Sequence, residues 1–191
     1  MNRQSLEEQE LKLELRLAQL ERNEACQNNF LQFVRRLWPE FITGRHHEII
    51  AEKLERVAKG ELKRLIINMA PRHTKSEFAS FLFPAWMMGR KPNMKIIQAT
   101  HTTELAVNFG RKTKNMIDSD EYKEIFPEVK LAADSKASGR WDTSAGGMYY
   151  AVGVGSNLAG RGGDLVIIDD PHSEQTAMSN NGFDDAWEWY T

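Results

Sequence analysis

Three short runs of apolar residues most constrain the fold of this chain. They occupy 65–69, 94–100 and 165–168, and each has the length and composition of a buried strand. Segments with helical periodicity follow the first two runs, over 76–88, where Pro84 interrupts the pattern, and over 103–116. This alternation of strand and helix predicts an α/β fold whose central sheet is mainly parallel and flanked by helices.

The residues before the first apolar run are expected to be helical. Residues 1–24 are rich in Glu, Leu, Gln and Arg, which favour a helix, although alternating leucines at 11–17 would also fit a strand. Two amphipathic helices are expected over 28–38 and 46–59. The second of these should turn four apolar side chains inward: Ile49, Ile50, Leu54 and Val57.

The later elements are shorter. Residues 141–143 and 148–154 are typical of a β-hairpin that turns at 145–147. The hairpin and the apolar strands are expected to belong to one domain. We therefore divide the chain into an N-terminal polar helix or arm, 1–27, and a single domain over 28–191.

Composition and charge exclude several classes of protein. Of 191 residues, 41% are hydrophobic and 27% are charged, which is ordinary for a globular domain. A net charge of −2 excludes a polybasic DNA binder, although a local basic patch would still serve DNA. Cys26 is the single cysteine, and the five histidines lack zinc-site spacing, so neither a disulfide nor a zinc site is expected. The chain shows no signal peptide and no run near the roughly 20 apolar residues of a membrane span, which predicts a soluble cytoplasmic protein.

The segment 66–76 has the layout of a phosphate-binding loop, with a strand, a loop and then Lys75-Ser76 opening a helix. Backbone N–H groups would hold the phosphates of ATP, Lys75 would reach the β- and γ-phosphates, and Ser76 would bind Mg²⁺. The usual glycines are replaced by Met69 and Thr74. If the loop needs positive φ at Thr74, its β-branched side chain costs about 1–3 kcal/mol. The residues expected to contact the nucleotide are Pro71, Arg72, His73, Thr74, Lys75 and Ser76. The alternative is a plain strand-to-helix turn.

The last apolar run ends in two carboxylates, Asp169 and Asp170, which is the Walker B layout. A parallel strand would deliver Asp169 to the C-terminal edge of the sheet, where it would bind Mg²⁺ directly or through water. Asp170 would orient or deprotonate the attacking water. Because Asp is shorter than the more usual Glu, that water must lie closer. The alternative is a strand-ending turn before Pro171.

Three groups of basic residues are further candidates. Arg72 lies inside the loop, where its charge would stabilise the transferring phosphoryl group; the alternative is an exposed side chain at a loop tip. Arg161 is expected at the N-terminal end of the last strand, away from the carboxylates, where a structural role is as plausible as a catalytic one. Helix-dipole placement would explain the cluster Arg111, Lys112 and Lys114 late in a helix.

Several motifs, in order, resemble the large subunits of tailed-phage terminases. The matching stretches are 65–77, 83–86, 109–111, 160–171 and 187–190. Many members of that family carry Pro-Pro-Arg-His-Gly-Lys-Ser-Glu in the phosphate loop, and this chain departs from it at Ala70 and Thr74. The resemblance extends from about Phe30 to the last residue.

The resemblance implies a RecA-like P-loop ATPase that uses ATP and Mg²⁺ to thread viral DNA into a preformed capsid. It places the family's lysine and Mg²⁺-binding hydroxyl at Lys75 and Ser76, its Walker B aspartate at Asp169 and its catalytic carboxylate at Asp170. Arg72 is the candidate for a catalytic arginine finger. The implied partners are double-stranded viral DNA, the small terminase subunit, the portal protein and further copies in a ring. The implied location is the cytoplasm of an infected bacterium, transiently at the procapsid portal.

Family members continue beyond the ATPase motifs with a coupling motif, a lid and a nuclease domain. Because this chain stops at Thr191, we expect an ATPase domain that is incomplete at its C-terminus, and no nuclease activity. Two alternatives stay open. One is a helicase-like P-loop ATPase, since 169–172 resembles the acidic box of helicases. The other is a nucleotide-binding fragment without turnover of its own.

Overall fold

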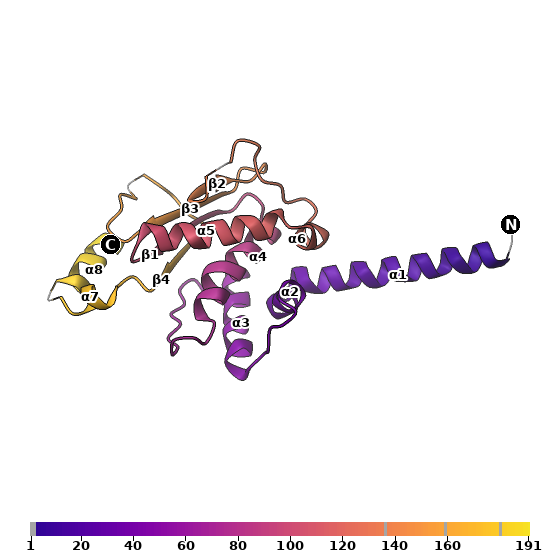
Figure 1. Ribbon diagram of the computed structural model, residues 1–191, viewed down its shortest axis with the longest axis horizontal. Helices are drawn as coiled ribbons and strands as arrows, with labels where there is room; N and C mark the ends of the chain where they lie inside the picture. The colour runs from indigo at the N-terminus through magenta and orange to yellow at the C-terminus, as the bar shows by residue number, and fades with distance from the viewer. Residues whose placement is uncertain (1–2, 136, 159, 180) are drawn as a thin grey trace.

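The computed structural model describes residues 3–135, 137–158, 160–179 and 181–191. These residues form an α/β fold in which N-terminal helices precede a four-stranded, mostly parallel sheet with flanking helices (Figure 1). The helices are α1 (Arg3–Asn28), α2 (Phe30–Leu37), α3 (Arg45–Ala58), the π-helix η1 (Glu77–Leu82), α4 (Phe83–Arg90), α5 (Thr103–Asp118), α6 (Asp120–Ile125), α7 (Glu174–Ala177) and α8 (Gly182–Tyr190). The strands are β1 (Lys95–Thr100), β2 (Arg140–Asp142), β3 (Met148–Gly153) and β4 (Leu165–Asp169).

The sheet confirms the mainly parallel arrangement predicted from the sequence. Its strand order is β2-β3-β1-β4, with β1 parallel to both β3 and β4 and β2 antiparallel to β3. The hairpin prediction is therefore confirmed as well. At the carboxyl end of β1, Thr100 lies between Gly153 and Asp169. Helix α5 packs along the sheet, so its first turn also lies near this edge (Figure 1).

The strand predicted over 65–69 is wrong. Leu65, Ile67 and Met69 pack against the core, whereas Ile66 between them is 86% exposed. The segment thus has the alternating burial of a strand, but in the described part of the chain no strand pairs with it. Strand β4 is consequently an edge strand, and Val166 is half exposed rather than buried on both faces as we expected.

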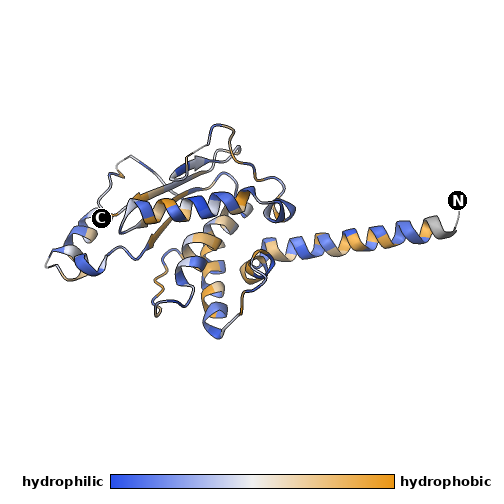
Figure 2. Cartoon of the chain, in the orientation of Figure 1, coloured by the Kyte–Doolittle hydropathy of each residue, from blue (hydrophilic) through white to orange (hydrophobic). Residues whose placement is uncertain are grey.

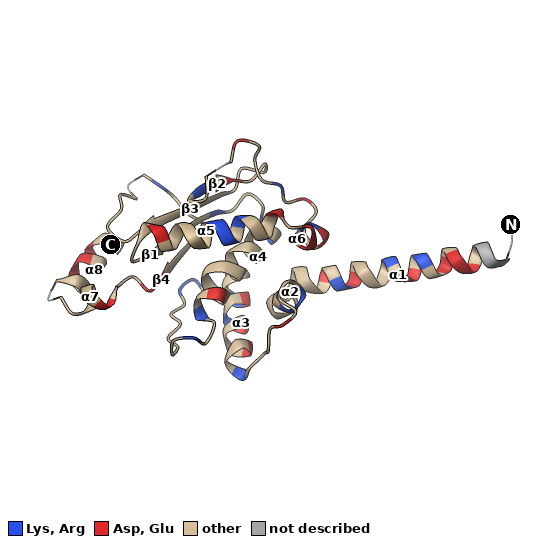
Figure 3. Cartoon of the chain, in the orientation of Figure 1, with Lys and Arg blue, Asp and Glu red and all other residues tan. Residues whose placement is uncertain are grey.

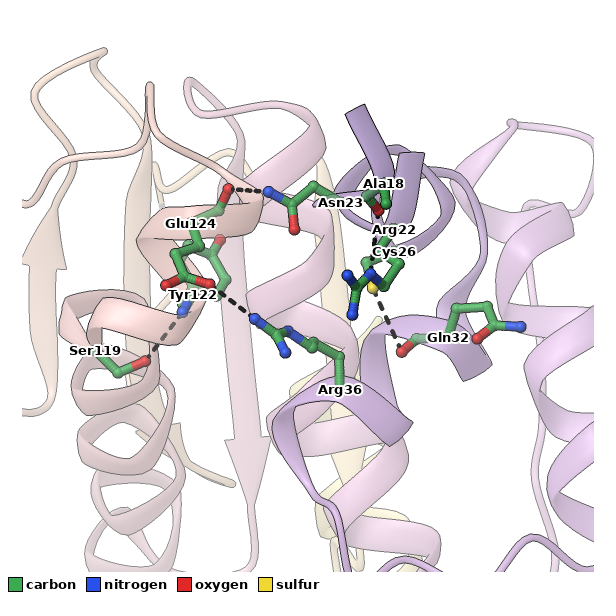
Figure 4. Close-up of polar contacts among 9 residues, drawn as sticks. All are labelled: Ala18, Arg22, Asn23, Cys26, Gln32, Arg36, Ser119, Tyr122 and Glu124. Atoms are coloured by element: carbon green, nitrogen blue, oxygen red, sulfur yellow. Dashed lines mark hydrogen bonds and ion pairs between the residues drawn. The ribbon is translucent and has the colours of Figure 1, made fainter. Parts of the chain in front are cut away.

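Helix α1 confirms the helical reading of the N-terminal residues over the strand alternative. Its leucines are exposed, and apolar and polar residues alternate along it, with both signs of charge (Figures 2 and 3). Its C-terminal turns dock on the domain, where Asn23 donates to the Glu124 carbonyl (2.8 Å) and Cys26 is buried (Figure 4). From α2, Arg36 pairs with the Glu124 carboxylate at 2.7 Å. In the described residues, no helix is both long and apolar enough to cross a membrane.

Aromatic rings join the N-terminal helices to the helix that follows the loop. The Phe30 ring of α2 is fully buried and meets four others, those of Phe33, Phe78, Phe83 and Trp86, with centroids 5.4–6.4 Å apart. On α3 the inward residues are Ile50 and Leu54, with Val57 half-buried. The prediction for Ile49 is wrong, because the buried stripe of this helix passes through His47 and Ile50 and leaves Ile49 exposed.

Pro84 does not interrupt the helix after the loop. It is the second residue of α4, which directly follows η1, so it lies where the helix changes from π to α. The preceding turn is a π-turn, in which Phe83 N–H donates to the Phe78 carbonyl. The chain is therefore helical without a break from Glu77 to Arg90. This rod packs against α5 and β4, which fixes the position of the loop at its start.

Candidate active site

The loop before η1 has a backbone that most residues avoid. Arg72 and Thr74 have φ values of 63° and 61°. Thr74 therefore has the positive φ for which we expected a strain cost, because this β-branched residue occupies the left-handed region. In the described residues, the non-glycine residues with positive φ are Arg72, Thr74 and Asp170, and all three were selected as site residues from the sequence. Such backbone strain is characteristic of functional sites.

Lys75 joins the loop to the acidic end of β4. Its Nζ atom lies 2.5 Å from Asp170 Oδ1 and 3.5 Å from Asp169 Oδ1. Burial alone would lower the pKa of Lys75, but the hydrogen bond that Lys75 donates to Asp170 and the charges of both carboxylates outweigh it and raise that pKa. The two motifs found in the sequence, far apart along the chain, are thus in direct contact.

The two carboxylates differ in their surroundings. The Asp169 side chain is 8% exposed, whereas that of Asp170 is 61% exposed. The backbone of Asp170 has a φ of 43°, and its carbonyl accepts hydrogen bonds from the backbone N–H and the ring Nδ1–H of His101, both at 3.2 Å. The inner carboxylate is therefore held in the sheet, and the outer one reaches solvent.

His101 is a candidate-site residue that the sequence reasoning missed, since this histidine was weighed only as a metal ligand. Its position directly after an apolar strand was the available signal, because the ends of parallel strands meet at one edge.

The remaining loop residues lie at or just before the start of the helix. Phe78 N–H donates to the Thr74 carbonyl at 3.0 Å, so the helical turns begin at Lys75 and Ser76, both half-buried. Pro71, Arg72 and His73 are exposed, and the His73 Nδ1–H donates to the Pro71 carbonyl at 2.9 Å. All six predicted loop residues therefore lie between the exposed loop tip and the first helical turn.

The oxygen donors near the loop fit Mg²⁺ better than a transition metal. In the described residues, no three His, Cys, Asp or Glu side chains gather as a metal cluster. A phosphate-bound Mg²⁺ needs only one or two protein oxygens, since phosphate and water supply the rest. Ser76 and Asp169 are hard oxygen donors of this kind, and the positive charge of Lys75 suits a phosphate chain.

The other basic residues have local partners. The Arg161 guanidinium stacks 4.2 Å from the Tyr150 ring centroid, near the start of β4, as expected for a residue away from the carboxylates. Lys112 pairs with Glu77 at 2.6 Å, and Lys114 donates to the Ser135 carbonyl. The helix-dipole explanation for the 111–114 cluster is wrong, because α5 continues to Asp118 and its last turn lacks basic residues.

His47 contacts the loop from α3, and the sequence reasoning missed this role too. Its Nε2 lies 2.6 Å from Thr74 Oγ1, and Gly44 N–H donates to its Nδ1 at 2.9 Å. The available signal was that His47 lies three residues before Ile50, on the apolar stripe of its helix. A polar side chain on such a stripe is buried and must find hydrogen-bond partners. Burial, with the neighbouring His46 and His73, lowers the pKa of His47.

We expect His47 to make the protein less stable in mild acid. Because its pKa is lower in the folded than in the unfolded state, only the unfolded state takes up a proton as the pH falls below about 6.5. The stability contribution of His47 is therefore full above that pH and is lost below it. Between about pH 7.5 and pH 5, the free energy of unfolding measured in urea should fall more for the parent than for His47→Asn. The other four histidines are present in both proteins, so an equal fall in the two would contradict the expectation.

No protein-family model matches this chain, and a search of curated proteins finds no match either. The class is therefore defined by the fold and site alone: an α/β protein in which a strained loop places a lysine against two carboxylates at the end of a parallel strand.

Proposed function

We propose that this chain is the ATPase domain of a tailed-phage terminase large subunit, a RecA-like P-loop ATPase that couples ATP hydrolysis to movement of viral DNA into the procapsid. One observation carries the proposal. Lys75 of the loop meets Asp169 and Asp170 at the C-terminal edge of the sheet, as a phosphate loop and a Walker B strand require. The ordered motifs that resemble the terminase family support it. The DNA, small-subunit, portal and ring partners, and the location at the procapsid, belong to the same proposal.

Each side chain has a role that its environment suits. Lys75 binds the β- and γ-phosphates; Ser76 and Asp169 would hold Mg²⁺, which would supply charge neutralisation on the phosphates. Asp170, with its exposed carboxylate, orients the attacking water and accepts its proton. The exposed guanidinium of Arg72 stabilises the transferring phosphoryl group. In the nucleotide-free protein Lys75 is held by Asp170, so phosphate binding exchanges one anionic partner of the lysine for another.

A nucleotide-binding domain without turnover of its own is the second candidate, and one observation favours it. The segment 65–69 before the loop is not hydrogen-bonded into the described sheet, and β4 has a free edge. The loop is thus tied to the acidic strand through side chains and the η1 helix rather than through a shared sheet. Catalysis requires these groups to hold their geometry within a fraction of an ångström, whereas binding is more tolerant.

Replacing Lys75 by Ala tests the proposal. Loss of a charge-assisted contact to phosphate should weaken ATP·Mg²⁺ binding by about 10–100-fold, measured by isothermal titration calorimetry. Lys63→Ala is the matched control, since Lys63 is exposed and precedes the loop, and its affinity should equal that of the parent.

Retention of parent-like affinity in Lys75→Ala would overturn the proposal. Binding without steady-state hydrolysis by the parent would select the second candidate. Hydrolysis stimulated by double-stranded DNA without strand separation would distinguish a packaging motor from a helicase.

A further inference from the structure

Thr74 occupies a conformation that its own side chain disfavours. Its φ of 61° lies in the left-handed region, where a β-branched residue is a genuine outlier. Phosphate loops of the usual pattern have glycine at this position, which adopts such a φ without strain. A surrounding contact must therefore hold Thr74, because strained backbone persists only where its neighbours over-determine it.

A chain of hydrogen bonds runs from the start of α3 through the Thr74 hydroxyl to the loop backbone. Because Gly44 N–H donates to His47 Nδ1 (2.9 Å), that nitrogen is unprotonated and the ring proton lies on Nε2. Nε2–H then donates to Thr74 Oγ1 at 2.6 Å. The Thr74 hydroxyl in turn donates to the His73 carbonyl at 2.6 Å. Each proton in the chain has one acceptor, so the direction of every bond is determined.

The His47 ring is itself fixed in place. The residue is 6% exposed, and its ring contacts those of Phe41 and Phe78, at centroid distances of 4.7 and 5.0 Å, while the two phenylalanine rings also contact each other. Phe78 belongs to η1, the helix that the loop opens. The imidazole therefore contacts both the loop and the helix after it. These contacts restrict rotation of the ring and keep its Nε2–H directed at Thr74.

We propose that His47 is a positioning residue that holds Thr74 in its left-handed conformation, so that this loop keeps a phosphate-binding shape without the usual glycine. The effect of His47 on nucleotide rests on the proposed function; its effect on the loop backbone does not. His47 acts through Thr74 and is not itself a phosphate ligand. The depressed pKa of His47 agrees with the neutral ring that the bond from Gly44 requires.

A double-mutant cycle tests this role. His47→Asn keeps an acceptor near Gly44 but cannot reach Thr74, and Thr74→Gly removes the residue that needs holding. In the parent background His47→Asn should weaken ATP·Mg²⁺ binding about tenfold, and in the Thr74→Gly background less than about twofold. His47→Gln, whose amide nitrogen can take the position of Nε2, should recover most of the affinity. An equal loss in both backgrounds, or no recovery in His47→Gln, would overturn the proposal.

NMR of the nucleotide-free proteins separates this inference from the proposed function. The ¹⁵N shifts of His47 should report protonated Nε2 and unprotonated Nδ1, and the Thr74 carbon shifts should report left-handed backbone in the parent and move in His47→Asn. A parent that binds no ATP would end the proposed function, while these shifts would still decide the role of His47. Thr74 shifts that do not change in His47→Asn would overturn that role even if ATP binds.

Discussion

Asp170→Asn is expected to lower ATP turnover by about 10²–10⁴-fold, the usual contribution of a positioned general base. Asparagine has the shape of aspartate but cannot accept the proton of the attacking water. The same change removes the anion that holds Lys75 at 2.5 Å, so ATP·Mg²⁺ should bind at least as tightly as in the parent. Steady-state hydrolysis and calorimetric binding, measured on one preparation, separate the two effects.

Asp185→Asn is the matched control for this experiment. Asp185 is exposed on α8, so its replacement by the same amide should leave both turnover and binding unchanged. Turnover that survives in Asp170→Asn at the parent rate would show that the hydrolysis arises from another group or another protein. A parallel fall in binding and turnover would instead assign Asp170 to holding the nucleotide.

Phe30→Ala is expected to have the largest effect on stability, a loss of about 3–5 kcal/mol in the free energy of unfolding. The Phe30 ring is fully buried and touches rings of α2, η1 and α4, so its removal leaves a cavity between the N-terminal helices and the helix after the loop. Urea unfolding monitored by circular dichroism measures the change.

An exposed phenylalanine provides the comparison. Phe183 on α8 is mostly exposed and contacts the ring of His172, so Phe183→Ala should cost less than about 1.5 kcal/mol. Similar losses in the two variants would mean that the Phe30 cluster does not hold the N-terminal helices to the domain. Because Phe78 also packs against His47, Phe30→Ala should in addition weaken ATP binding.

Much of the fold could be predicted because its signals are local. Helical periodicity and the residue preferences of α1, α2 and α5, the glycine turn of the β2–β3 hairpin, and the apolar run of β4 each lie within a few consecutive residues. The site residues Lys75, Ser76, Asp169 and Asp170 were selected from the ends of such elements. The placement of Asp169 and Asp170 followed from the rule that parallel strands present their carboxyl ends at one edge, whereas no paired strand precedes Lys75 and Ser76 in the described sheet.

The failed predictions depended on neighbours that are distant in sequence. The run 65–69 has strand-like alternation, but a strand also needs a partner for its backbone N–H and C=O groups, and the described sheet offers none there. Ile49 is apolar and was therefore expected to face inward, but α3 is oriented so that His47 faces the core and Ile49 faces solvent. The helix-dipole explanation of the 111–114 cluster required knowing where α5 ends. The helix ends at Asp118, four residues after the cluster.

The sequence by itself determined helices α1, α2, α3 and α5 and strands β1 to β4, that the sheet is mainly parallel, and that Asp169 and Asp170 lie at the end of a strand, since each follows from the spacing of neighbouring side chains. Only the tertiary structure decided that Lys75 contacts both carboxylates, that 65–69 stays unpaired, and that His47 holds Thr74. The physical reason is that a hydrogen bond or ion pair depends on the distance between two atoms in space. Packing of whole elements sets that distance, and residue spacing along the chain does not.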